Sequence, residues 1–194
     1  MMRVRRAVAI SAASLLFLAI EPLRAATSGA TSGTDSYSQG EIVKAASDAF
    51  ASGSEGVAKA VETIFKKYGR PNAYIVGQEG SGAIGVGLRY GEGDLHRKNG
   101  GTTHVYWQGP SINFDVGANA SKSFTLVYNL GRTDQIFQRF PGLEGIYYFI
   151  GGIGVNYQQA GGIILAPMRT GLGVRAGVNA GYLSYTRERK ILPF

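Results

Sequence analysis

The chain contains 194 residues, with no cysteine, 29 glycines and a formal net charge of +7. The lack of cysteine excludes a disulfide framework and thiol chemistry, and the length is enough for one domain with its own hydrophobic core. The basic charge does not by itself indicate a nucleic-acid partner, because much of it lies at the N-terminus.

Residues 1–25 have the layout of a secretory signal peptide. A basic start is followed by an apolar run over residues 7–20 and by a cleavage site with small residues at 25 and 26, so that cleavage is expected after Ala25. This layout is typical of a cleavable export signal, and the apolar run is shorter than the roughly 20 residues that a membrane-spanning helix needs. Cleavage removes four arginines and one glutamate, a net of +3, and lowers the formal charge from +7 to +4. We therefore expect a periplasmic mature chain, residues 26–194, without a transmembrane span or a nucleic-acid partner.

Residues 26–37 are small and polar, which predicts a disordered linker. Ser38 and Glu41 then form a capping-box pattern, in which the serine and the glutamate satisfy backbone N–H groups at a helix start. This pattern predicts a first helix that begins near Glu41 and ends near Phe50.

A second helix is expected over residues 55–68, because its apolar residues recur at helical spacing. Gly69 is a suitable C-terminal cap, and Pro71 prevents the helix from continuing. We assign residues 38–70 to a helical segment that packs on the following domain.

From residue 71 onward the sequence predicts short strands separated by turns. The expected strands are 73–77, 83–97, 105–108, 112–118, 124–130, 146–157, 163–167 and 171–186. A short helix is expected over residues 133–140, which are followed by Pro141. About eight strands with regular turn signals predict a mainly β domain, a small soluble antiparallel β-barrel over residues 71–194.

The longest strands have apolar residues on one parity and glycine or polar residues on the other. The pattern of Gly85–Gly91 is repeated in Gly171–Gly177, and each copy contains one arginine. The apolar sets are Ile84, Val86 and Leu88; Ile112, Phe114 and Val116; Ile153, Val155 and Tyr157; and Leu172, Val174, Ala176 and Val178. The opposite sets include Arg89, Asn113, Asp115, Asn156, Arg175 and Asn179.

We expect the apolar sets to face the barrel interior, because burying apolar surface stabilises a fold by about 25 cal/mol per Å². A barrel embedded in a membrane has the opposite arrangement, with apolar residues toward lipid. In the apolar-in arrangement Arg89 and Arg175 lie on the outer face, where the N-terminal helices are the expected cover. A covered arginine needs a partner, since an unpaired buried charge costs several kcal/mol, and Asp115 is the expected one.

Several blocks of this sequence resemble the periplasmic envelope integrity protein A family of Gram-negative bacteria. The matching blocks are Arg89–Gly93, Val105–Ser111, Phe114-Asp115, Leu126–Leu130, Arg139–Gly142, Leu165–Pro167 and Gly181–Leu183. The resemblance covers about residues 72–186, and Asn113 and the bulky run 146–148 depart from it. It implies a soluble periplasmic β-barrel that supports envelope integrity, with no known reaction. The glycine spacing around Trp107 and Pro110 is also similar to that of the SYLF lipid-binding domain.

Three patterns suggest chemistry and are outweighed by simpler interpretations. Gly80–Gly85 matches a dinucleotide fingerprint, but a strand follows where the phosphate site needs a helix. His96, His104 and Asp94 flank a turn and could bind a metal ion, although such residues are more often solvated. Glu79, Glu92 and Asp94 could act as glycosidase carboxylates, and glycine-flanked acids are more often plain surface. We expect no metal, no cofactor and no catalytic residues.

Alternation places Tyr106 and Trp107 on opposite faces of one strand, so that one ring is expected to be buried and the other available to a ligand or membrane surface. Basic pairs such as Lys66-Lys67 and Arg97-Lys98 could contact anionic head groups or lipopolysaccharide phosphates. The candidate binding residues are Arg89, Tyr90, Tyr106, Trp107, Asp115 and Arg175.

The expected function is that of a non-catalytic periplasmic protein that supports cell-envelope integrity and stress resistance, with lipid or lipopolysaccharide as the candidate ligand. Two alternatives remain at this point: an enzyme acting on envelope glycans or lipids, and an outer-membrane-embedded barrel. Convergent acid, base or nucleophile residues would favour the enzyme, and an apolar outer band would favour the embedded barrel.

Overall fold

The computed structural model describes residues 35–51, 55–82, 87–111, 121–170 and 181–190. They all belong to one compact unit, residues 31–194. The expected signal peptide (1–25) and most of the expected linker lie outside the described residues, as do the expected strand 112–118 and most of the run 171–186. None of the described helices is long and apolar enough to cross a membrane.

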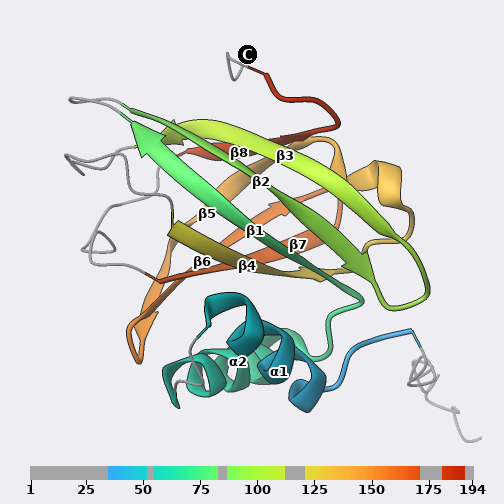
Figure 1. Cartoon of the computed structure of the whole chain (residues 1–194), viewed down its shortest axis with the longest axis vertical. Coiled ribbons are helices and arrows are strands. Elements are labelled where there is room, and N and C mark those ends of the chain that lie inside the picture. Colours follow the sequence, from blue (N-terminus) through green and yellow to red (C-terminus); the bar gives the residue numbers. More distant parts are fainter. Residues whose placement is uncertain (1–34, 52–54, 83–86, 112–120, 171–180, 191–194) are drawn as a thin grey trace, which may run out of the picture. The chain divides into compact units, whose positions relative to one another are not determined.

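Two helices precede the strands, as the sequence predicted. Helix α1 spans Gln39–Phe50 and helix α2 spans Glu55–Tyr68 (Figure 1). The capping box of Ser38 and Glu41 is formed at the start of α1, because the serine side chain accepts a hydrogen bond from the Glu41 backbone and the glutamate accepts one in return. Gly69 follows α2 with a φ of 74°, the left-handed conformation that ends many helices.

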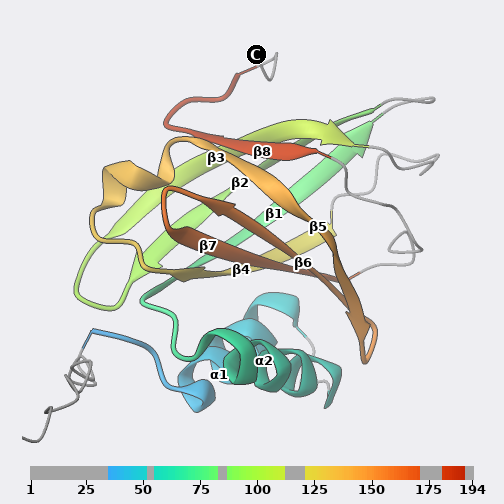
Figure 2. The same ribbon diagram turned by 180° about the vertical axis from the view of Figure 1, so that it is seen from behind.

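In the described part of the chain, eight antiparallel strands form a closed barrel in the order β1-β2-β3-β8-β5-β6-β7-β4 (Figures 1 and 2). Their bounds are β1 Ala73–Gly82, β2 Gly87–Arg97, β3 Thr102–Ser111, β4 Ser121–Tyr128, β5 Arg139–Ile150, β6 Ile153–Ala160, β7 Ile163–Thr170 and β8 Tyr182–Thr186. The chain is not a simple meander, because β8 lies between β3 and β5, and β4 pairs with both β1 and β7. The expected barrel fold is therefore confirmed.

Two expected elements differ from the structure. The run 146–157 is not one strand but a hairpin, in which Gly151 and Gly152 have φ values of 57° and 87° and connect β5 to β6. The helix expected over 133–140 is a single 3-10 turn, Thr133–Ile136, and β5 begins at Arg139. The long apolar run concealed the hairpin, since periodicity alone does not locate a tight turn.

The described residues form two separate hydrophobic cores. The lumen core fills the barrel with side chains from strands all around it, namely Ala73, Ile75, Leu95, Val105, Trp107, Val127, Leu130, Ile136, Phe140, Ile163, Leu165, Leu183 and Tyr185. The layer core lies between the helices and the outer face of the barrel, and its strand residues are Phe124, Leu126, Tyr128, Ile153, Val155, Tyr157, Ala166 and Met168. Both helices therefore cover the outside of β4, β6 and β7, beneath the barrel as drawn in Figure 2.

The expected orientation of the strand faces is wrong. Val155 and Tyr157 of β6 lie outside, in the layer core, whereas Asn156 between them faces the lumen. In β2, Leu88 is only partly buried, and Arg89 is 5% exposed and forms an ion pair inside the barrel. The physical reason is that the helices give the outer face an apolar partner, so the apolar parity need not point inward. The other members of the four sets on 84–86, 112–116 and 172–179 lie outside the described residues.

Candidate functional site

The lumen contains a buried group of polar side chains, which we call the lumen charge cluster: Glu79, Arg89, Trp107, Asn156 and Arg169. Strand register aligns its members, since Glu79 lies opposite Gly91, and Gly91 lies opposite Trp107 on the next strand. The cluster lies toward the barrel end at which β1 and β7 finish and β2 begins. The opposite part of the lumen is apolar, as expected for a barrel of this size.

Glu79 is the centre of the cluster and is 6% exposed. Its Oε1 atom forms ion pairs with Nε of Arg169 and, at 3.7 Å, with Nε of Arg89. Its Oε2 atom accepts a hydrogen bond of 3.2 Å from the indole Nε1 of Trp107. One buried carboxylate is thus held by two guanidinium groups and an indole N–H, which offsets the cost of removing its charge from water.

Arg169 is 8% exposed, and two of its three guanidinium nitrogens face described partners. Its Nη1 atom donates a 3.3 Å hydrogen bond to Oδ1 of Asn156, and Nε faces Glu79. Its Nη2 atom is fully buried and has no hydrogen-bond partner among the residues that the structure describes. A buried N–H group without an acceptor costs roughly 1–3 kcal/mol, more when charged, so this atom requires an explanation.

Glycines on the lumen face make room for the tryptophan. A Cβ atom at Gly91 would lie 2.1 Å from Cε2 of Trp107, and one at Gly77 would lie 2.7 Å from its Cη2. The glycine face that the sequence analysis placed outside is therefore an inner face, occupied by the indole ring. The glycines at these two positions let the indole ring lie against the strand backbone, where the indole N–H reaches Glu79.

Tyr185 of β8 completes the surroundings of the cluster. Its ring packs beside Trp107 with centroids 5.7 Å apart, and the residue is 2% exposed. Burial raises the pKa of Tyr185 far above its ordinary value, so the phenol stays neutral and able to donate a hydrogen bond.

The structure brings together only part of the expected binding set. Arg89 and Trp107 belong to the cluster, whereas Tyr106 and Tyr90 have the opposite parity and lie on the outer side. Tyr106 is partly buried and packs against His104 at 4.9 Å between ring centroids. The last two candidates, Asp115 and Arg175, lie outside the described residues, so Asp115 remains only a predicted arginine partner.

Sequence reasoning missed Arg169 altogether and considered Glu79 only as a candidate glycosidase carboxylate or a surface acid. Parity contained a usable signal, since Glu79 continues the lumen positions Ala73, Ile75 and Gly77, and Arg169 continues Leu165 and Pro167. That signal could be used only after the lumen side of each strand was known.

The two histidines contact different side chains. His104 Nδ1 lies 2.8 Å from Oδ1 of Asp94 on the outer face, and His96 contacts the hydroxyl of Thr102 at 3.1 Å. Within the described ranges no three histidine or carboxylate side chains are grouped as metal ligands.

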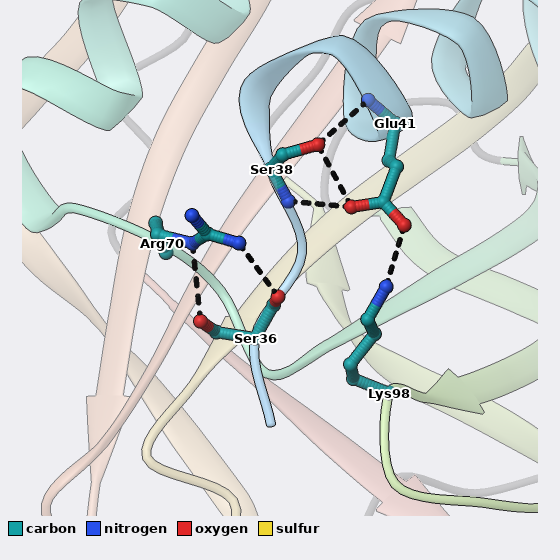
Figure 3. Close-up of polar contacts among 5 residues, drawn as sticks. All are labelled: Ser36, Ser38, Glu41, Arg70 and Lys98. Atoms are coloured by element: carbon teal, nitrogen blue, oxygen red, sulfur yellow. Dashed lines mark hydrogen bonds and ion pairs between the residues drawn. The ribbon is translucent and has the colours of Figure 1, made fainter. Parts of the chain in front are cut away.

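A second polar group fastens the helix layer to the barrel (Figure 3). Lys98, in the turn between β2 and β3, pairs with Glu41 of α1, which also accepts hydrogen bonds from the Ser38 backbone and hydroxyl. The lysine and the serine contacts lower the pKa of Glu41 to about 2. Arg70, after α2, donates to the side chain and carbonyl of Ser36.

Known proteins support the fold and assign the family. Residues 35–194 match the family described as envelope integrity protein A. A solved crystal structure of a β-barrel-like, uncharacterised protein from Brucella abortus is 44% identical, with a TM-score of 0.76, covering 82% of this chain and 99% of that one. No curated protein was found to be similar. Because the match spans most of the sequence, the chain belongs to the envelope integrity protein A family.

Proposed function

We propose that this chain is a non-catalytic periplasmic protein that supports cell-envelope integrity by binding an anionic lipid or lipopolysaccharide at the polar end of its barrel. Family membership supports the envelope role. The observation that carries the binding role is the lumen charge cluster, in which arginines 5% and 8% exposed share one carboxylate. Such buried cations recur where proteins recognise acidic groups.

The bonding of Glu79 supports binding rather than catalysis. A catalytic carboxylate needs an oxygen directed at a substrate, either to take a proton or to attack. Both oxygens of Glu79 are already engaged, one by two arginines and the other by Trp107. This arrangement holds the two arginines in position and leaves neither carboxylate oxygen of Glu79 directed at a substrate.

The outer face of β2 and β3 supports a barrel in water rather than one embedded in lipid. Glu92, Asp94, His96 and His104 alternate with the lumen residues of these strands and therefore point outward. A lipid-facing band is apolar, and charged side chains there are costly. The apolar outer positions of β4, β6 and β7 are covered by α1 and α2 instead.

The proposal is tested by purifying the chain from the periplasm and recording native mass spectra. We expect a bound species with the mass of an anionic lipid or lipopolysaccharide fragment. Deletion of the gene should sensitise cells to detergents and bile salts, and the wild-type chain should restore resistance. If the purified chain carries no such ligand, the binding role is contradicted. If deletion of the gene gives no envelope phenotype, the envelope role is contradicted.

A further inference from the structure

We infer that the lumen charge cluster is an oxyanion site, in which Arg169 binds a single phosphate or carboxylate group of a ligand. The inference deepens the proposed function and rests on it for the source of the ligand. Its first support is the Nη2 atom, which is fully buried without a hydrogen-bond partner among the described residues and belongs to a side chain that is nine-tenths buried. A guanidinium group is rarely left with a buried donor unused, and oxyanions are its preferred acceptors.

The charges of the cluster supply the second support. Two guanidinium groups and one carboxylate give its described members a formal charge of +1. Glu79 faces Arg169 through Nε, and Asn156 takes Nη1, so neither described partner serves the remaining nitrogen. An arriving anion would therefore meet a preorganised, desolvated cation, where charge-assisted hydrogen bonds are strongest.

Arg169 has small neighbours on both adjacent strands. In the strand register it lies opposite Ser123 on β4 and Gly154 on β6, two of the smallest residues. Larger residues at these positions would cover the arginine from both sides. No bulky side chain therefore lies directly opposite the arginine on the two neighbouring strands.

The apolar part of the lumen limits what the site can take. It is filled by the side chains of the lumen core, including Ile75, Phe140 and Leu165, each 0–1% exposed. An acyl chain would have to displace that core. We therefore assign to the cluster only the acidic head group, presented from the barrel end at which β1 and β7 finish.

Trp107 provides a direct readout, because it is the only tryptophan in the chain and it donates to Glu79. The full-length mature chain is titrated with inorganic phosphate, with dodecyl phosphate below its micelle concentration, and with dodecyltrimethylammonium as the cationic counterpart. We expect both phosphate probes to change the tryptophan emission and the cation to leave it unchanged. Tighter binding of dodecyl phosphate than of inorganic phosphate indicates a lipid head group, and equal binding indicates the free anion.

The variant that tests the assignment is Arg169→Gln, with Arg189→Gln as a control that removes an equal charge from an exposed ion pair. We expect phosphate affinity to fall at least tenfold in the first and to stay within twofold in the second. Arg169→Lys keeps the charge but loses the planar donor and should bind with intermediate affinity. Equal affinity in Arg169→Gln and Arg189→Gln overturns the inference.

A melting experiment on the wild-type chain decides the matter if Arg169→Gln does not fold. A ligand that binds only the native state raises the melting temperature as its concentration rises. Phosphate should therefore stabilise the wild type more than chloride does at equal ionic strength, and no difference overturns the inference. A lipid that co-purifies equally with wild type and Arg169→Gln also overturns it while leaving the proposed function in place. A wild type without lipid that still binds phosphate contradicts the proposed source alone.

Discussion

Replacing Glu79 with glutamine should strongly destabilise the barrel. The substitution keeps the size of the side chain and an oxygen for Trp107, but it removes the carboxylate shared by Arg89 and Arg169. All three charged residues are at most 8% exposed, so water cannot replace the lost charge. Breaking one partner of a buried ion pair costs about 3–5 kcal/mol, which is a large part of the roughly 5–15 kcal/mol that stabilises a typical domain.

Urea unfolding of the mature chain at pH 7 measures this loss directly, provided that the slope of the transition stays constant. The matched control is Glu92→Gln, which removes the same charge from an exposed pair with Arg189 and should cost far less. A double variant, Glu79→Gln with Arg169→Met, should recover part of the loss, because the second change removes one buried cation. The reasoning is refuted if Glu79→Gln unfolds like Glu92→Gln, or if the losses from Glu79→Gln and Arg169→Met are additive in the double variant.

Three further predictions follow from described contacts. Gly91→Ala should lower the free energy of unfolding by about 1–3 kcal/mol and shift the tryptophan emission, because the new Cβ would overlap the Trp107 ring. Gly80→Ala is the control, since a Cβ there has nothing within 4 Å, and equal losses of the two variants in urea unfolding would contradict the prediction. Tyr128→Phe should leave the free energy of unfolding unchanged or raise it by about 1 kcal/mol, because the tyrosine hydroxyl is buried without a partner among the described residues. A loss of more than about 1 kcal/mol in urea unfolding would contradict this prediction. Lys98→Met should raise the pKa of Glu41 from about 2 toward 4.5, which an NMR titration would measure. Because folding lowers this pKa, the pair stabilises the fold above pH 4.5 and loses that effect as the pH falls toward 2. The free energies of unfolding of variant and wild type should therefore converge at about pH 2.

Local signals predicted the helices well. The capping box of Ser38 and Glu41 and the glycine at 69 act within one helical turn, so the start of α1 and the end of α2 follow from nearby residues. The expected total of about eight strands also agrees with the structure, although the expected strand 112–118 lies outside the described residues and the run 146–157 belongs to two strands. The β5–β6 hairpin was missed because Gly151 and Gly152 lie inside an apolar run that reads as one strand.

The site was harder to predict because it depends on which strand face points inward. Period-two alternation shows that the two faces of β6 differ, but it does not say which of them faces the lumen. Here the helices cover Val155 and Tyr157 on the outside, and the polar parity of the strand lies within. Pairing of Glu79 on β1 with Arg169 on β7 further required the barrel closure, which joins these strands through β4.

The position of β8 has a consequence for how the barrel assembles. This strand is only five residues long, yet it pairs with β3 on one side and β5 on the other. Until residues 182–186 are in place, both neighbours keep unpaired backbone edges, which other chains can join. Closure thus waits for a late segment to insert between two earlier ones, a non-local step that slows folding and prolongs the exposure of these edges. A holding chaperone that shields β3 and β5 would be most useful in this interval.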